Sequence, residues 1–120
     1  MITAYLYSSC TSCRKAKDVL EETGANYEVR EYFKQKVTRD ELDGLLSATG
    51  LSVSDILSTR STPYKQGNLA EKNLSDDEIL NMMIEEPRLI KRPILVSGSN
   101  SVVGFKDGKI RDLVAQDNAS

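Results

Sequence analysis

The stretch Tyr7-Ser8-Ser9-Cys10-Thr11-Ser12-Cys13-Arg14-Lys15 decides how the rest of the chain is interpreted, because it holds both cysteines of the protein. An alternating apolar pattern over residues 2–7 precedes it and predicts a strand. Small or apolar side chains then recur with the spacing of a helix's buried face, at Ala16, Val19, Leu20 and Thr23. The cysteine pair is therefore expected where a strand ends and a helix begins.

The start of a helix favours an ionised thiol. Its first turn leaves backbone N–H groups without helical partners and carries the positive end of the helix dipole. We therefore expect the pKa of Cys10 to lie below the free value of about 8.5. Arg14 and Lys15 add positive charge. Cys10 is expected to be the exposed nucleophile, and Cys13, about one turn later, to attack any adduct that Cys10 forms.

Length and composition limit the class of protein. The chain has 120 residues, a net charge of −2, 39% hydrophobic and 28% charged residues, which indicates one soluble globular domain. No basic face is implied, so direct nucleic-acid binding has little electrostatic support. Neither a membrane-length apolar run nor a signal peptide is recognisable, so no membrane contact and a cytoplasmic location are expected. In that compartment a cysteine pair is more often redox-active than structural.

The chain contains no histidine, which excludes several kinds of site. Ser-His-Asp and Cys-His catalytic arrangements cannot form. Two cysteines alone cannot complete a structural zinc site, so no metal is expected. The alternative for the pair is a structural disulfide or two inert thiols. We favour the redox interpretation because of the compartment and the position between strand and helix.

The order of predicted elements indicates an α/β fold. A strand at 2–7, a helix to Thr23 and a strand at 25–31 form a parallel β-α-β unit. Capping boxes at residues 38–41 and 75–78 open helices that end near 50 and 86, with a short helix at 52–58 and a loop at 59–68 between them.

The last third of the chain completes the predicted sheet. Strands at 93–96 and 102–105 form a hairpin, a helix spans about 109–115, and residues 116–120 are expected to fray. The whole order predicts a thioredoxin-like mixed four-stranded sheet, β-α-β … β-β-α, in a single domain 1–120 with a helical insertion at about 38–86. By analogy with that fold, a cis bond before Pro93 would turn Arg92 toward the cysteines.

Four segments resemble the arsenate reductase/Spx family, and the resemblance covers nearly the whole chain. They are Cys-Thr-Ser-Cys-Arg-Lys-Ala at 10–16, Ser-Thr-Arg-Ser at 58–61, Leu-Ile-Lys-Arg-Pro-Ile at 89–94 and Val-Gly-Phe at 103–105. The family has two branches. One contains thiol-dependent arsenate reductases, and the other contains Spx-type redox-sensing regulators that bind the C-terminal domain of the RNA polymerase α-subunit.

The reductase branch implies a specific set of roles. Cys10 would attack arsenate, Cys13 would resolve the adduct and release arsenite, and Arg14, Arg60 and Arg92 would hold the oxyanion. Thioredoxin, or glutaredoxin with glutathione, would return the electrons, and no bound cofactor is implied. The regulator branch implies that the same pair acts as a sensor.

The sequence departs from both branches. The reductases' oxyanion arginine in the middle segment falls on Ser58, with Arg60 two residues later, and the arginine after the hairpin falls near Phe105 and Lys106. The glycine that Spx-type regulators place at their polymerase-facing surface falls on Ser52. From the sequence we favour arsenate-reductase-like chemistry, with the Spx-type regulator as the alternative. A general disulfide reductase is less favoured, because the family's inserted lobe covers much of the site.

Overall fold

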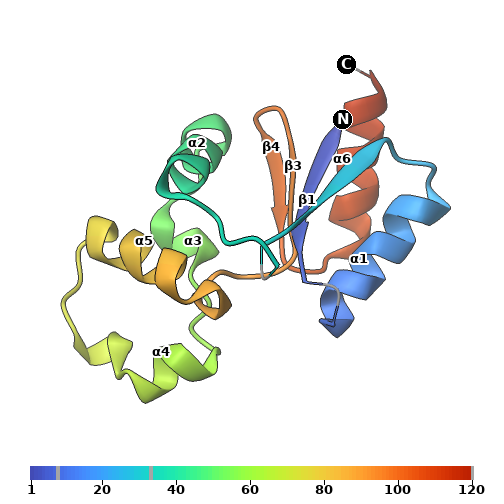
Figure 1. Ribbon diagram of the computed structural model, residues 1–120. Coiled ribbons are helices and arrows are strands. Elements are labelled where there is room, and N and C mark those ends of the chain that lie inside the picture. The colour runs from blue at the N-terminus through green and yellow to red at the C-terminus, as the bar shows by residue number, and fades with distance from the viewer. Residues whose placement is uncertain (8, 33, 120) are drawn as a thin grey trace. The chain divides into compact units, whose positions relative to one another are not determined.

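The chain divides into two compact units, each described here by itself. The computed structural model describes residues 1–7, 9–32 and 34–119. The first unit contains residues 1–34 and 92–120, and the second contains 35–91 (Figure 1). The expectation that the two form a single domain stays a prediction.

The first unit is built on a mixed four-stranded sheet, as expected. Its strands are β1 (Ile2–Leu6), β2 (Tyr27–Glu31), β3 (Ile94–Ser97) and β4 (Asn100–Val103), in the order β2-β1-β3-β4. Strand β1 pairs in parallel with β2 and antiparallel with β3, which forms an antiparallel hairpin with β4. The predicted β-α-β … β-β-α sheet is therefore confirmed.

Two helices cover one face of this sheet, α1 (Thr11–Glu22) and α6 (Asp107–Ala119) (Figure 1). Alternate residues of β1 are buried against them, as the period of two requires. The core combines strand and helix side chains: Ile2, Ala4, Leu6, Cys13, Ala16, Val19, Leu20, Leu95, Val102, Ile110, Leu113 and Val114. Cys13 thus belongs to the core, which fixes the position of its sulfur.

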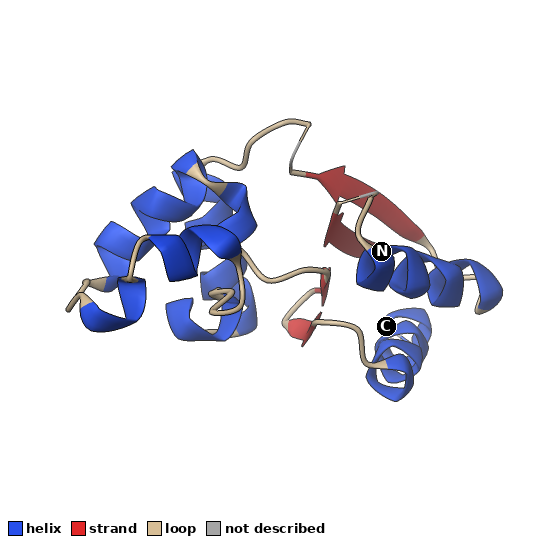
Figure 2. Cartoon of the chain, turned by 90° about the horizontal axis from the view of Figure 1, so that it is seen from below, coloured by secondary structure: helices blue, strands red, loops and turns tan. Residues whose placement is uncertain are grey.

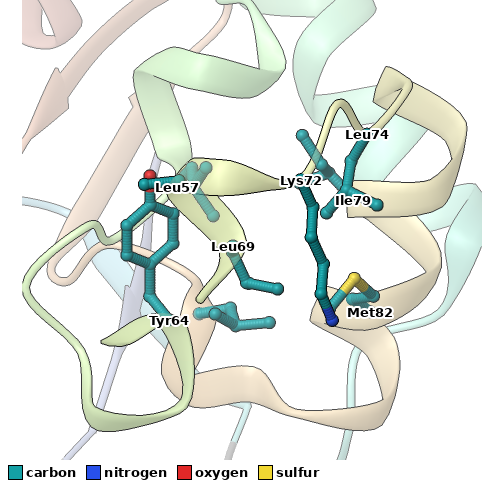
Figure 3. Close-up of a pocket in the computed structure, with 9 residues that line it drawn as sticks. Leu57, Tyr64, Leu69, Lys72, Leu74, Ile79 and Met82 are labelled. Carbon is teal, nitrogen blue, oxygen red and sulfur yellow. The ribbon is translucent and has the colours of Figure 1, made fainter. Parts of the chain in front are cut away.

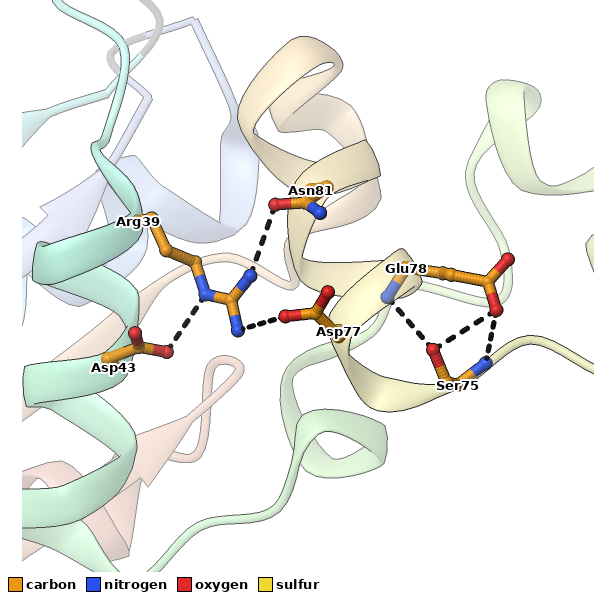
Figure 4. Close-up of polar contacts among 6 residues, drawn as sticks. All are labelled: Arg39, Asp43, Ser75, Asp77, Glu78 and Asn81. Atoms are coloured by element: carbon orange, nitrogen blue, oxygen red, sulfur yellow. Dashed lines mark hydrogen bonds and ion pairs between the residues drawn. The ribbon is translucent and has the colours of Figure 1, made fainter.

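The second unit consists of short helices (Figure 2). They are α2 (Arg39–Thr49), α3 (Val53–Ile56), α4 (Thr62–Gln66) and α5 (Asp76–Glu85), with 3-10 turns η1 (Leu69–Glu71) and η2 (Pro87–Leu89). The capping boxes predicted at 38–41 and 75–78 are both present, the second drawn in Figure 4. A third caps α3, where Ser52 and Asp55 bond each other's backbone N–H groups. The serine at position 52 is therefore explained locally, because its side chain caps α3.

A polar cluster links α2 to α5 inside the second unit (Figure 4). The guanidinium of Arg39 donates to Asp43 at 3.0 Å, to Asp77 at 2.7 Å and to Asn81 at 3.1 Å. Asp43 lies on the same helix as Arg39, whereas Asp77 and Asn81 lie on α5. One side chain therefore bridges two helices that the sequence places well apart.

An apolar cavity of about 220 Å³ lies within the second unit (Figure 3). Its lining is almost entirely apolar apart from Tyr64 and Lys72, and comprises Leu57, Tyr64, Leu69, Ala70, Lys72, Leu74, Ile79, Met82 and Leu89. The sequence suggested core packing for the methionines of α5. Met83 is fully buried, but Met82 is half-buried and lines this cavity.

Two expectations about the ends of elements were wrong. Residues 59–68 are not simply a loop, because α4 forms there with Ser61 as its N-cap and Pro63 in the first turn, where a proline costs no hydrogen bond. Residues 116–119 do not fray, because α6 runs to Ala119. The Asp117 carboxylate holds that last turn by accepting a hydrogen bond from Ser97 Oγ at 2.7 Å.

The second strand of the hairpin also begins earlier than predicted. Strand β4 starts at Asn100 rather than at residue 102, because Gly98 takes a positive φ of 59° and allows a tight turn.

Within the described ranges, no helix is long and apolar enough to cross a membrane.

Candidate redox site

Cys10 is the N-cap of α1, where the strand-to-helix junction was expected. Its backbone is extended, with φ −81° and ψ 128°, and its carbonyl accepts the helical hydrogen bond from the N–H of Arg14 at 3.0 Å. The Cys10 N–H donates to the carbonyl of Tyr7 at 2.9 Å. The side chain is half-buried and the thiol is free. Cys10 therefore presents its sulfur at the first turn of a helix to which it is firmly bonded.

Cys13 lies one turn later, on the buried face of the same helix. Its side chain has no exposed surface and its thiol is also free. The sulfur accepts a hydrogen bond from the backbone N–H of Tyr7 at 3.4 Å. The two cysteines thus share one helical turn but differ in access to solvent, as the sequence predicted.

The pKa of Cys10 is lowered from its ordinary value by its surroundings. Partial burial opposes ionisation, but several hydrogen bonds and one charge outweigh it. The backbone N–H and the thiol of Cys13 both favour the Cys10 thiolate, as do the Arg92 guanidinium and the N–H of Ser12. These N–H groups are the unpartnered donors at the start of α1. Cys10 is therefore the thiol that ionises first.

The pKa of Cys13 is raised to about 12, chiefly because burial penalises the charged thiolate. Its hydrogen bond to Cys10 and the negative charge of the Cys10 thiolate raise it further, while the Tyr7 N–H and Arg92 oppose the shift. At neutral pH the pair is thus one thiolate-forming sulfur beside one protonated sulfur. That is the arrangement of an attacking and a resolving thiol.

Arg92 is the predicted arginine that the structure brings to the cysteines. The Arg92–Pro93 peptide bond is cis, as the fold analogy suggested. The guanidinium lies 5.7 Å from the centre of the Tyr7 ring, and its charge acts on both cysteines. Arg92 is half-buried, so a bound anion could reach it.

The other two predicted arginines are placed differently. Arg14 is exposed on α1 and, with Cys13 and Lys17, lines a cavity of about 250 Å³ that Val29 and Glu31 of β2 close. Arg60 is exposed in the second unit, just before α4. The oxyanion-binding roles of Arg14 and Arg60 stay predictions.

Two tyrosines near the thiols were missed from the sequence. Tyr7 was noted as the end of a strand, without a role, although it contacts Arg92 and bonds both cysteines. Tyr32 is almost fully buried, and its pKa is raised by burial and then by the charge of Cys13, with Arg92 acting in the opposite sense. Sequence spacing gives no sign of Tyr32, because it follows β2 and only the pairing of β2 with β1 places it near the thiol segment.

Known proteins support the family resemblance. The model of the ArsC family matches residues 5–113. The chain belongs to the ArsC family.

Proteins similar to this ArsC-family chain are named either as regulators or as arsenate reductases. The regulatory protein MgsR of Bacillus subtilis is 39% identical over 112 residues, covering 93% of this chain and 89% of that protein. The global transcriptional regulator Spx of Streptococcus pneumoniae is 37% identical, covering 92% and 84%. The structure of an arsenate reductase from Vibrio cholerae superposes with a TM-score of 0.78 at 28% identity, covering 96% and 95%.

Proposed function

We propose that this ArsC-family protein is a redox-sensing transcriptional regulator of the Spx type, with Cys10 and Cys13 as its switch. The observation that carries the proposal is the unequal pair, in which Cys10 ionises readily and Cys13 is held buried and protonated one turn away. Its similarity to MgsR and Spx, at 39% and 37% identity over more than nine-tenths of this chain, favours a regulator.

The switching chemistry balances with a peroxide as oxidant. The Cys10 thiolate attacks one oxygen of hydrogen peroxide, breaks the O–O bond and becomes a sulfenic acid, and the departing hydroxide takes up a proton to leave as water. The Cys13 sulfur then attacks the Cys10 sulfur, a second water leaves, and the disulfide closes. Two thiols lose two electrons and peroxide gains them. Thioredoxin or glutaredoxin would reverse the reaction.

The partner of such a regulator is RNA polymerase, through the C-terminal domain of its α-subunit. The net charge of −2 and interspersed signs suit a protein partner better than DNA. Closing a bond between Cys10 and Cys13 would remove the thiolate charge and reshape the first turn of α1. Both changes alter the surface around Arg92, which also acts on the two sulfurs.

A binding experiment in two redox states tests the regulator proposal directly. Binding of the isolated C-terminal domain of the polymerase α-subunit is measured by titration calorimetry, with the protein either reduced or treated with peroxide. We expect binding whose affinity differs between the two states. The Cys13→Ser variant should lose that difference, because it cannot close the disulfide. Absence of binding in both states would overturn the proposal.

Arsenate reduction is the second candidate, supported by Arg92 beside the Cys10 thiol and by the similarity to the Vibrio cholerae arsenate reductase. The Cys10 thiolate would attack the arsenic of arsenate and displace a hydroxide, which takes up a proton and leaves as water. Cys13 would then attack Cys10, so that arsenite leaves with both electrons and the disulfide remains. We rank this second, because Ser58 and the pair Phe105 and Lys106 stand where reductases have arginines.

Turnover separates the two candidates. Arsenate-dependent NADPH oxidation is followed with the thioredoxin system or with glutathione and glutaredoxin, supplied separately. If the protein is a reductase, thioredoxin should support turnover, because intramolecular attack by Cys13 outcompetes a thiol in solution. Cys13→Ser should then be inactive or depend on glutathione and glutaredoxin. No turnover with either donor, together with polymerase-domain binding, would exclude the enzyme.

A further inference from the structure

Tyr7 connects the three groups of the thiol site. Its carbonyl accepts the N–H of Cys10 at 2.9 Å, and its own N–H donates to the Cys13 sulfur at 3.4 Å. Its ring lies under the guanidinium of Arg92 at 5.7 Å from centroid to Cζ. Tyr7 therefore bonds both cysteines through its backbone and contacts the Arg92 guanidinium through its ring.

We propose that Tyr7 is a positioning residue of this site, whose ring holds the Arg92 guanidinium where its charge acts on Cys10. The inference rests on the proposed redox role of the cysteine pair and adds a residue to it. In this role the ring of Tyr7 does not contact the reacting sulfur atoms. It acts through Arg92.

The physical reason lies in what an aromatic face does to a cation. The electron-rich face attracts a guanidinium, yet the ring carries no net charge and leaves the full positive charge of Arg92 to act on the sulfur. A carboxylate in the same place would orient the arginine but cancel its field. Arginine otherwise has many rotamers, and a charge that spends time in bulk water is screened from the thiolate.

The backbone is anchored on both sides of the contact between Tyr7 and Arg92. Arg92 lies just before β3 and Tyr7 lies just after β1, and these two strands pair antiparallel. Pro93 is fully buried and its carbonyl accepts the N–H of Gly104 at 2.8 Å, so the backbone at Arg92 is anchored as well. The remaining conformational freedom is that of the Arg92 side chain, which the Tyr7 ring would restrict.

The consequence is a measurable shift in thiol reactivity. Tyr7→Leu removes the π face while keeping an apolar side chain, so Arg92 should spend less time near Cys10. Cation–π contacts at partly exposed sites are of a size that changes an ionisation constant by about two- to fivefold. The pH midpoint of the iodoacetamide rate of Cys10 should move upward, and the rate at neutral pH should fall by up to that factor. Tyr7→Phe keeps the ring and should behave as the wild type.

The experiment is a double-mutant cycle on the reduced protein. Iodoacetamide rates against pH are measured for wild type, Tyr7→Leu, Tyr7→Phe, Arg92→Ala and the Tyr7→Leu/Arg92→Ala pair. We expect Tyr7→Leu to have no further effect once Arg92 is absent. Tyr27→Leu is the matched control, because Tyr27 is also half-buried in the first unit but its hydroxyl bonds Glu21. It should leave the pH profile unchanged.

Several outcomes overturn the inference. An unchanged profile for Tyr7→Leu, or an equal loss with and without Arg92, would mean that Tyr7 acts through its backbone or through packing alone. If Tyr7→Leu does not fold by circular dichroism, Tyr7→Met replaces it as a flexible apolar residue without a π face. The assay needs neither peroxide, arsenate nor polymerase, so its failure is distinct from failure of the proposed function.

Discussion

The backbone N–H of Tyr7 donates a hydrogen bond to the sulfur of Cys13 across 3.4 Å. This contact joins the residue that follows β1 to the buried thiol and helps to hold the Cys13 sulfur in place. It favours a thiolate at Cys13 slightly, but burial is the larger effect and keeps that sulfur protonated. Cys13 is thus held buried and protonated one turn from Cys10, as we expect of a resolving thiol.

Cys10 should react first with an alkylating agent. Alkylation requires the thiolate, and a lowered pKa populates the thiolate at a lower pH, so the rate of Cys10 should level off below the pH at which a free cysteine does. The measurement is iodoacetamide labelling against pH with peptide mass mapping. Cys10→Ser should remove the fast phase, and faster labelling of Cys13 would reverse the assignment.

The Cys13→Ala variant should make Cys10 less acidic. The backbone N–H and the thiol of Cys13 both favour the Cys10 thiolate and lower its pKa, and alanine keeps only the backbone N–H. The Cys10 pKa should rise toward its ordinary value, and labelling at neutral pH should slow. Cys13→Ser retains a hydroxyl donor and should show a smaller change. Equal profiles for the two variants would argue against the thiol hydrogen bond.

Arg39→Ala should weaken the packing of α2 on α5. It removes contacts to Asp77 and Asn81 on the other helix. The cluster is exposed, so the loss of stability should be small. The decrease in melting temperature should be larger at low salt than at high salt. Arg88→Ala is the control, because its partner Glu86 lies only two residues away. An equal effect of both variants would deny Arg39 any bridging role.

Ile110→Ala should destabilise the first unit strongly. Ile110 on α6 is fully buried against the sheet, so truncation leaves a cavity and should lower the free energy of unfolding by about 2–5 kcal/mol. Val29→Ala removes methyl groups from a side chain that is 42% exposed, and should cost less than about 1 kcal/mol. Urea unfolding measures both. A small loss for Ile110→Ala would contradict the core assignment.

Periodic and capping signals predicted most of the local structure correctly. Buried alternation at Ile2, Ala4 and Leu6 identified β1, and the capping box that Thr38 begins identified the start of α2. Where the signal was ambiguous the prediction was wrong. Pro63 was taken for a loop residue although it fits the first turn of α4. Polar residues at the chain end were expected to fray, but Asp117 is anchored to Ser97 from another element.

The candidate site, too, was predicted in part from the sequence and decided in part by the tertiary structure. The sequence by itself determined where the cysteine pair lies, because a Cys-x-x-Cys spacing at a strand-to-helix junction sets one thiol at the N-cap and the other on the buried face, from helix geometry alone. The tertiary structure decided which charges and rings surround them. Arg92, Tyr7 and Tyr32 come from three separate segments, and sheet pairing brings these segments together at the cysteines. A thiol's pKa depends on neighbours within a few ångströms, whatever their separation along the chain.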